Sequence, residues 1–158
     1  MAELALLASI VQIADVGLRL SSRLFLFGQT VATADRSIVA ISKDVKLTSY
    51  VLQHLGQTFK DDKNFIHSRK ATETAEEVAQ ECSNVFEEMD TILLKKLSHL
   101  KDESSTEKKA RGKILLERLK WPTLKGKMDL LSCNLDRLKS TLTLMLEVLN
   151  YAQKVAKR

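Results

Sequence analysis

The chain has 158 residues, of which 44% are hydrophobic and 28% are charged, and its formal net charge is +5. This composition is typical of one soluble globular domain and excludes a disordered tail or a multi-span membrane protein. Five glycines and one proline are too few for the turns of an all-β or doubly wound α/β fold, so the sequence predicts an all-α protein. The glycines also stand too far apart to form a phosphate-binding loop, which argues against a nucleotide-binding enzyme.

The cysteines and the N-terminus indicate a cytoplasmic protein. Cys82 and Cys133 are too few for a disulfide scaffold, and no CxxC motif or Cys/His cluster is present to bind zinc. No basic residue precedes the first apolar run, so a secretory signal is not expected. The longest stretches without charge, residues 4–14 and 24–34, have eleven residues each, whereas a membrane-spanning helix needs about 20. A constitutive transmembrane segment is therefore not expected.

The first predicted element is a very apolar helix over residues 2–27. Its charged residues Asp15, Arg19 and Arg23 fall four apart and predict a ladder of ion pairs on one narrow, solvent-facing stripe. Gly28 is expected to end the helix. Because the rest of the circumference is apolar, we expect this helix to lie most deeply among the others.

A second helix is predicted from a heptad pattern that ends before a polar turn at residues 60–64. Its apolar positions alternate in steps of three and four: Val31, Ala34, Ile38, Ile41, Val45, Thr48, Leu52, Leu55 and Phe59. A third helix, from about residue 65, continues the alternation: Ala71, Ala75, Val78, Cys82, Val85, Met89, Ile92 and Lys96.

Residues 101–113 lack apolar periodicity and predict a flexible loop. Ser104 and Glu107 have the spacing of a capping box, so a short fourth helix is expected to begin there. The Trp121-Pro122 pair is expected to break or kink it, because proline disfavours a helical conformation of the preceding residue. A last helix is predicted from Pro122 onward, with its apolar positions again at heptad steps: Met128, Leu131, Leu135, Leu138, Leu142, Met145, Leu149, Ala152 and Ala156.

Together these elements predict a single helical domain over residues 1–158. Helices of this length suit an up-and-down bundle of four to five members with antiparallel neighbours. Because the last heptad pattern carries no helix-stop signal, we expect the natural chain to continue, with this domain as its N-terminal part.

The charges are unevenly distributed. Residues 72–90 hold seven acidic residues and no basic one, while residues 108–127 hold a cluster of eight basic residues with one acidic residue. The cluster is either a solvated face that pairs with the acidic segment or a patch that binds anionic lipid headgroups, with Trp121 at the interface. Nucleic-acid binding is not expected, because no recognised motif is present. The basic cluster consists of Lys108, Lys109, Arg111, Lys113, Arg118, Lys120, Lys125 and Lys127.

The apolar N-terminal helix has two interpretations. At rest it is expected to be the central core helix of the bundle. Once released it would become a membrane-seeking or self-associating segment, because its apolar arc would then face water. The residues expected to act in this way are Leu4, Leu7, Ala8, Ile10, Val11, Ile13, Leu24, Phe25 and Phe27.

No catalytic or metal-binding pattern is present in the sequence, so neither an enzyme activity nor a cofactor is expected. His54, His67 and His99 are dispersed, and no spacing joins a nucleophile to a base. Cys82 falls on an apolar seam and is expected to be a small core residue.

Four segments resemble the HeLo-like domains found at the N-termini of fungal NLR-type (STAND) proteins. They read MAELALLASIVQIA at residues 1–14, ISKDVKLTSYVL at 41–52, LKWPTLK at 119–125 and LDRLKSTLTLML at 135–146. The resemblance covers nearly the whole chain. It implies a helical-bundle signalling domain of an intracellular immune or heterokaryon-incompatibility receptor, in which programmed cell death follows oligomerisation and exposure of the N-terminal helix to membranes.

Two functions of different classes follow as hypotheses. The first is a signalling and cell-death execution domain that oligomerises, moves from the cytoplasm to the plasma membrane on activation, and perturbs membranes through residues 1–27 with help from the basic cluster. The second is an adaptor that binds other helical signalling domains and never contacts lipid. In both cases self-association or protein partners are expected.

Overall fold

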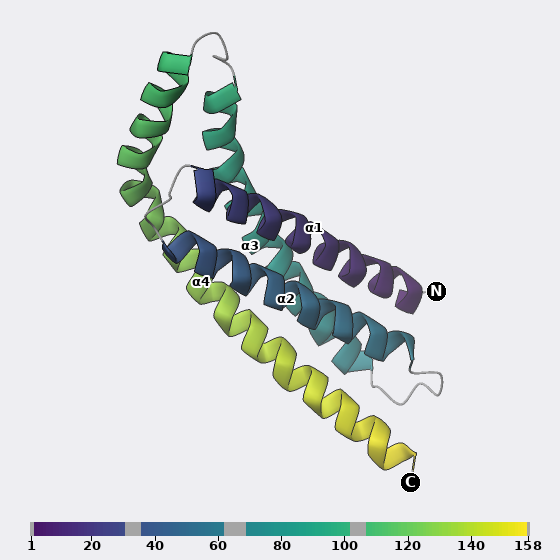
Figure 1. Ribbon diagram of the computed structural model, residues 1–158. Helices are drawn as coiled ribbons and strands as arrows, with labels where there is room; N and C mark the ends of the chain where they lie inside the picture. The colour runs from purple at the N-terminus through teal and green to yellow at the C-terminus, as the bar shows by residue number, and fades with distance from the viewer. Residues whose placement is uncertain (1, 31–35, 62–68, 102–106, 158) are drawn as a thin grey trace.

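The computed structural model describes residues 2–30, 36–61, 69–101 and 107–157, and these ranges form four α-helices and no strand. The helices are α1 (Ala2–Thr30), α2 (Arg36–Lys60), α3 (Arg69–Lys101) and α4 (Glu107–Ala156). The all-α bundle expected from the composition is therefore confirmed. Figure 1 shows the four helices running side by side, with their directions alternating along the chain.

The helices form a four-cornered bundle in which sequence neighbours are not always spatial neighbours. The order around the bundle is α1, α2, α4, α3, because α1 packs against α2 and α3 while α4 packs against the same two helices. The consecutive helices α2 and α3 lie at diagonal corners. The prediction that α1 lies most deeply was wrong: it has two principal neighbours, as every other helix has, and one of its sides faces solvent.

Along α2, the predicted heptad pattern coincides with the buried face. Of its predicted positions, Val31 and Ala34 lie outside the described residues, and Phe59 is half-buried. The remaining six are buried: Ile38, Ile41, Val45, Thr48, Leu52 and Leu55. Thr48 fits this apolar face because its hydroxyl donates a hydrogen bond to the Asp44 carbonyl, which leaves its methyl group to pack.

Helix α3 buries a wider face than its heptad pattern predicted. Ala75, Cys82, Val85 and Met89 are buried as expected. A second row, consisting of Ala79, Phe86 and Leu93, is buried as well. The reason is that α3 has two neighbours, α1 and α4, and a face that contacts two helices is broader than one coiled-coil seam.

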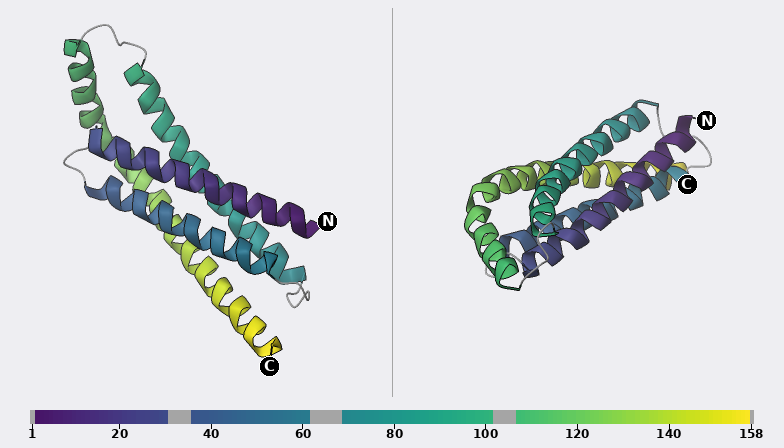
Figure 2. Two further views of the ribbon diagram at one scale, coloured as in Figure 1. Left: turned by 45° about the vertical axis from the view of Figure 1, so that its right-hand side comes forward. Right: turned by 90° about the horizontal axis from the view of Figure 1, so that it is seen from above.

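The C-terminal half of the chain differs from prediction in its boundaries. Residues 107–113, expected in a loop, are helical, and the two helices expected on either side of Trp121-Pro122 form the single helix α4. Pro122 therefore does not break the helix. Figure 2 shows instead that α4 curves in its green N-terminal part before running straight along α2 and α3, as expected where proline leaves one carbonyl without its backbone donor.

The predicted seam of α4 forms one side of the core. Met128, Leu131, Leu135, Leu142 and Leu149 are buried, and each such side chain contributes about 1.5–3 kcal/mol to folding. Leu138, Met145 and Ala152 are half-buried, while Ala156 is exposed near the end of the helix.

Candidate interaction surfaces

The chemically reactive side chains of the described residues are dispersed. His54 is exposed on α2, and His67 and His99 lie outside the described side chains. Burial raises the pKa of the Cys82 thiol to about 12, and the nearby Glu81 carboxylate adds to the rise. Cys133 is exposed on α4. Within the described ranges, no three His, Cys, Asp or Glu residues come close enough together to hold a metal ion.

The residues predicted to act on membranes from α1 lie on two different sides of that helix. Leu4 has no described side chain, Leu7 is half-buried, and Ala8, Val11 and Phe25 are exposed. The other four are core residues: Ile10, Ile13, Leu24 and Phe27. Only part of the predicted set is therefore available to a partner while the bundle is closed.

Among the described side chains of α1, Leu26 is the most exposed large apolar one, with 60% of its surface accessible, and it is not one of the residues predicted to act on membranes. It lies seven residues after Arg19, so it shares the solvent-facing side of the helix with Asp15 and Arg19. The polar stripe identifies this side of the helix in the sequence. An apolar residue seven positions after a member of the stripe, such as Leu26, is therefore expected to be exposed.

A groove of about 570 Å³ lies between α1 and α2 on the outer face of the bundle. Its apolar wall is formed by Leu18, Phe25 and Leu26 of α1, and the opposite wall carries Lys43 and Lys46 of α2. One turn further along α2, Tyr50 is exposed, and the Lys46 ammonium lies 5.8 Å from the centre of its ring. The groove therefore combines apolar and aromatic side chains with two positive charges.

In addition to its core side chains, three described contacts join α1 closely to its neighbours. Gly17 lies where α1 meets both neighbours: a Cβ atom there would collide with the Ser49 hydroxyl and would come within 2.8 Å of the Phe86 ring. The buried hydroxyl of Ser21 donates a 2.7 Å hydrogen bond to the Ser42 carbonyl of α2.

The third contact is an ion pair between α1 and α3. Arg23 Nη1 lies 2.5 Å from Asp90 Oδ1, so Arg23 binds the neighbouring helix and does not extend the predicted ladder within α1. The first step of that ladder is present, because Arg19 contacts Asp15 at 2.8 Å. The side chain of Arg23 thus spans the boundary between the solvent-facing stripe and α3.

Gly28, predicted to end α1, lies inside it and is buried. A Cβ atom at this position would come within 2.6 Å of Ile38 Cγ2 on α2. The glycine therefore allows the ends of α1 and α2 to approach closely, and the helix continues to Thr30.

The basic cluster lies on the N-terminal part of α4, which Figure 1 shows in green. Lys125 is half-buried and Lys127 is exposed, whereas the side chains of the other six members lie outside the described part of the chain. The backbone of all eight is helical, so the cluster, which was predicted over a loop, a short helix and the start of the last helix, belongs to one continuous element.

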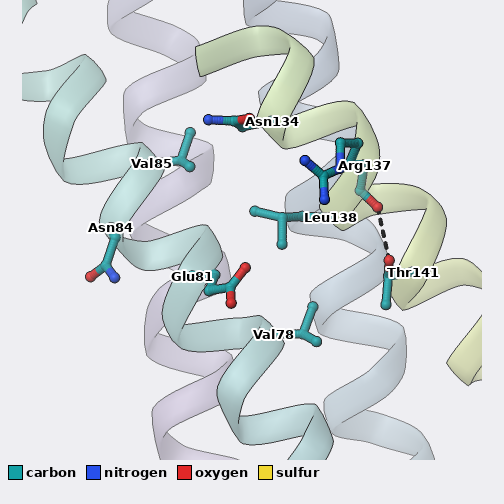
Figure 3. A pocket seen from close by; sticks show the side chains of 8 residues that line it. All are labelled: Val78, Glu81, Asn84, Val85, Asn134, Arg137, Leu138 and Thr141. Atoms are coloured by element: carbon teal, nitrogen blue, oxygen red, sulfur yellow. Dashed lines mark hydrogen bonds between the residues drawn. The ribbon is translucent and has the colours of Figure 1, made fainter. Parts of the chain in front are cut away.

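A second groove, of about 420 Å³, runs between α3 and α4. Figure 3 shows Glu81 and Val78 on the α3 wall and Arg137 on the α4 wall, with Leu138 between Glu81 and Arg137. The dashed line in Figure 3 is the 3.0 Å hydrogen bond that the Thr141 hydroxyl donates to the Arg137 carbonyl. Opposite charges therefore line two sides of an apolar groove, a pattern that suits a protein partner better than a lipid surface.

By length and composition alone, the segment Ala5–Gln29 of α1 is able to cross a membrane, with a mean hydropathy of 1.3. The core helix of a soluble protein passes the same test. Asp15, Arg19 and Arg23 interrupt this segment, so it does not stand out as a run without charge in the sequence.

Comparison with known proteins gives no relative. No protein family, no curated protein and no solved structure matches the chain.

Proposed function

We propose that this chain is a non-enzymatic signalling domain that acts on membranes through α1. The observation that carries the proposal is that the most apolar helix of the protein keeps exposed apolar side chains, Phe25 and Leu26, next to the α2 lysines Lys43 and Lys46. Apolar and aromatic groups beside cations are suited to the boundary between acyl chains and anionic headgroups. The closed bundle can therefore bind a membrane surface before any helix moves.

Insertion of α1 is the second step of the proposed mechanism. Its buried residues, among them Ile10, Leu20 and Leu24, would each lose about 1.5–3 kcal/mol of stabilisation if they left the core for water. The hydrocarbon interior of a membrane offsets this loss, so release is favoured only where lipid is already bound. The charges of Asp15, Arg19 and Arg23 make insertion of one helix costly and favour an oligomer that keeps them away from lipid.

The resemblance of four segments to HeLo-like domains supports the same proposal and makes it more specific. In that form the chain is the cell-death execution domain of a fungal NLR-like immune or incompatibility receptor. It is cytoplasmic at rest and reaches the plasma membrane after its receptor has clustered.

The experiment that tests membrane action is co-sedimentation of residues 1–158 with vesicles. We expect binding to vesicles that contain phosphatidylserine, and about tenfold weaker binding after Phe25→Glu and Leu26→Glu, since both side chains are exposed and each would place a carboxylate at the lipid surface. Leu94→Glu on α3 is the matched control, because Leu94 is also an exposed leucine but lies on another helix. Equal binding by all variants would contradict a role of α1.

An adaptor function is the second candidate, and the α3/α4 groove favours it, because opposite charges line an apolar surface there. An adaptor would bind its partner without responding to lipid charge. Substitution of Lys120, Lys125 and Lys127 by glutamate distinguishes the two functions. Loss of vesicle binding supports membrane action aided by the basic cluster, whereas no binding of the unmodified protein to either anionic or neutral vesicles supports the adaptor.

A further inference from the structure

Helix α4 carries a second row of apolar residues that faces solvent. Leu144, Val148, Tyr151 and Val155 are 62%, 58%, 70% and 54% exposed, respectively. The row lies away from the buried Leu142 and Leu149, which face the core from the same two turns of helix.

The spacing of this row is that of a coiled-coil seam. Its steps are four, three and four residues, which place all four side chains on one stripe along the helix. Single exposed apolar residues are normal on a protein surface, but four in heptad register form a continuous surface that is suited to a second helix. The inner seam of α4 is longer and leucine-rich, so it dominates the heptad pattern of the sequence and conceals this outer row.

The charges beside the row indicate which helix fits. Glu147 and Lys154 are exposed, occupy the same flank of the row, and stand seven residues apart. Neither forms an ion pair within the part of the chain that the structure describes. One flank thus carries a negative charge at one end and a positive charge at the other.

We propose that α4 pairs with α4 of a second copy of this chain in the antiparallel direction. In that arrangement Val148 of each copy lies in one layer with Tyr151 of the other, and Leu144 lies in one layer with Val155. The same register brings Glu147 of each copy next to Lys154 of the other, twice in the dimer. A single two-fold axis therefore matches both the apolar layers and the flanking charges.

The parallel direction does not use the charges. In a parallel pair, the flank that carries Glu147 and Lys154 on one helix meets the other flank of its partner. Glu147 would then lie next to Ala152, and no charge pair would form. Charge complementarity therefore selects a second copy in the antiparallel direction, and this pairing is independent of any membrane activity.

The first test is the oligomeric state of residues 1–158, measured by sedimentation velocity over a range of protein concentrations. We expect a monomer of 17.8 kDa that converts to a dimer. Leu144→Lys should abolish the dimer. Asn150→Lys, which adds the same charge to an exposed position off the row, should leave it intact. A protein that stays monomeric at the highest soluble concentration would overturn the proposal.

The second test is a charge reversal that identifies the direction. Glu147→Lys or Lys154→Glu alone places two like-charge pairs in the dimer, and we expect each variant to dimerise about tenfold more weakly. The double variant restores both pairs with opposite polarity and should regain the original affinity. Because both side chains are exposed, circular dichroism should show the same helix content in all three.

Cysteine cross-linking gives an independent readout of the register. In a Cys133→Ser background, a mixture of the Val148→Cys and Tyr151→Cys variants should form the mixed disulfide in preference to either symmetric one. Preferential Val148→Cys self-linkage indicates parallel helices and would overturn the antiparallel proposal. A dimer that survives Leu144→Lys would show that another surface, such as the α1/α2 groove, binds the second copy.

Discussion

Small side chains determine how closely α1 approaches its neighbours. At Gly17 the backbone of α1 packs directly on the Ser49 hydroxyl and the Phe86 ring, so there is no room for a larger residue. At Gly126 on α4 a Cβ atom would meet nothing within 4 Å. Two glycines within helices thus have opposite roles, and only the first is required by packing.

This contrast gives a prediction for stability. We expect Gly17→Val to lower the free energy of unfolding by about 1–3 kcal/mol, since overpacking forces the helices apart. Gly126→Ala should instead raise it by about 0.5–1 kcal/mol, because alanine is the better helix former and the site is open. Urea denaturation of the two variants measures both changes, and a Gly17→Val variant as stable as the unmodified protein would contradict the close contact.

The two cysteines should differ in reactivity. Burial raises the pKa of Cys82 to about 12, so its thiol stays protonated in the folded protein, whereas Cys133 is exposed. At pH 8 we expect a thiol reagent to modify Cys133 rapidly and Cys82 only after unfolding in urea. Rapid modification of a Cys133→Ser variant would show that Cys82 is accessible.

The same shift predicts a pH dependence. An unfolded Cys82 thiol ionises near pH 9, while the folded one stays protonated to about 12. Above pH 9 the unfolded state therefore binds fewer protons than the folded state, and the free energy of unfolding falls as the pH rises. Cys82→Ala should show a shallower fall between pH 9 and 11 in chemical denaturation, and identical slopes would contradict the assignment.

At the scale of single elements, α1 adds polar contacts with two neighbouring helices to its apolar core contacts. Its ion pair with α3 joins Arg23 to Asp90, and both side chains are only partly exposed. Its other polar contact joins Ser21 to α2. Loss of either contact should loosen α1 while leaving the α2/α4 and α3/α4 contacts in place.

Arg23→Glu is expected to place two carboxylates together and to raise the rate of amide hydrogen exchange in α1 more than in α4. The double variant Arg23→Glu/Asp90→Arg restores the ion pair and should return exchange towards its original rate. If vesicle binding increases in the single variant and falls again in the double variant, the ion pair restrains the membrane-active state. Unchanged exchange in Arg23→Glu would show that the apolar contacts alone hold the helix.

The elements also show what the sequence predicts well and what it does not. Heptad spacing identified the core residues of α2 from Ile38 to Leu55, because one pattern there corresponds to one buried face. It missed Ala79 and Phe86, because α3 contacts two helices. The two helices expected on either side of Pro122 form one, because proline chemistry alone does not decide between a break and a bend. A sequence pattern identifies which residues share a face of a helix, but the packing of the bundle determines which faces are buried. Leu26 and Leu144 are exposed because no other helix of the bundle covers their faces.

At the scale of the whole molecule, charge is distributed between opposite sides. The outer surface of α3 carries exposed acidic residues such as Glu76, Glu77 and Glu87, whereas Lys43 and Lys46 lie on the α1/α2 side. An anionic surface therefore attracts one side of the bundle and repels the other.

This asymmetry predicts the orientation of the protein on a membrane. Lys43→Gln/Lys46→Gln should weaken binding to phosphatidylserine vesicles about 30-fold, since each lysine near an anionic surface contributes about 1 kcal/mol. Glu76→Gln/Glu77→Gln removes two charges of the opposite sign on the far side and should not weaken binding. Vesicle sedimentation at several salt concentrations measures both, and equal losses in the two variants would contradict a preferred orientation.

The positions of α1 and α4 at opposite corners have a consequence for valency. If two copies join through α4, the α1/α2 face of each copy remains uncovered, because α1 packs against α2 and α3 and lies diagonal to α4. A dimer would then carry two membrane-binding faces, and the second gains from binding of the first where both reach the same vesicle. Vesicle binding would rise more steeply than in proportion to protein concentration, so that a modest increase in local concentration switches the domain from solution to the membrane.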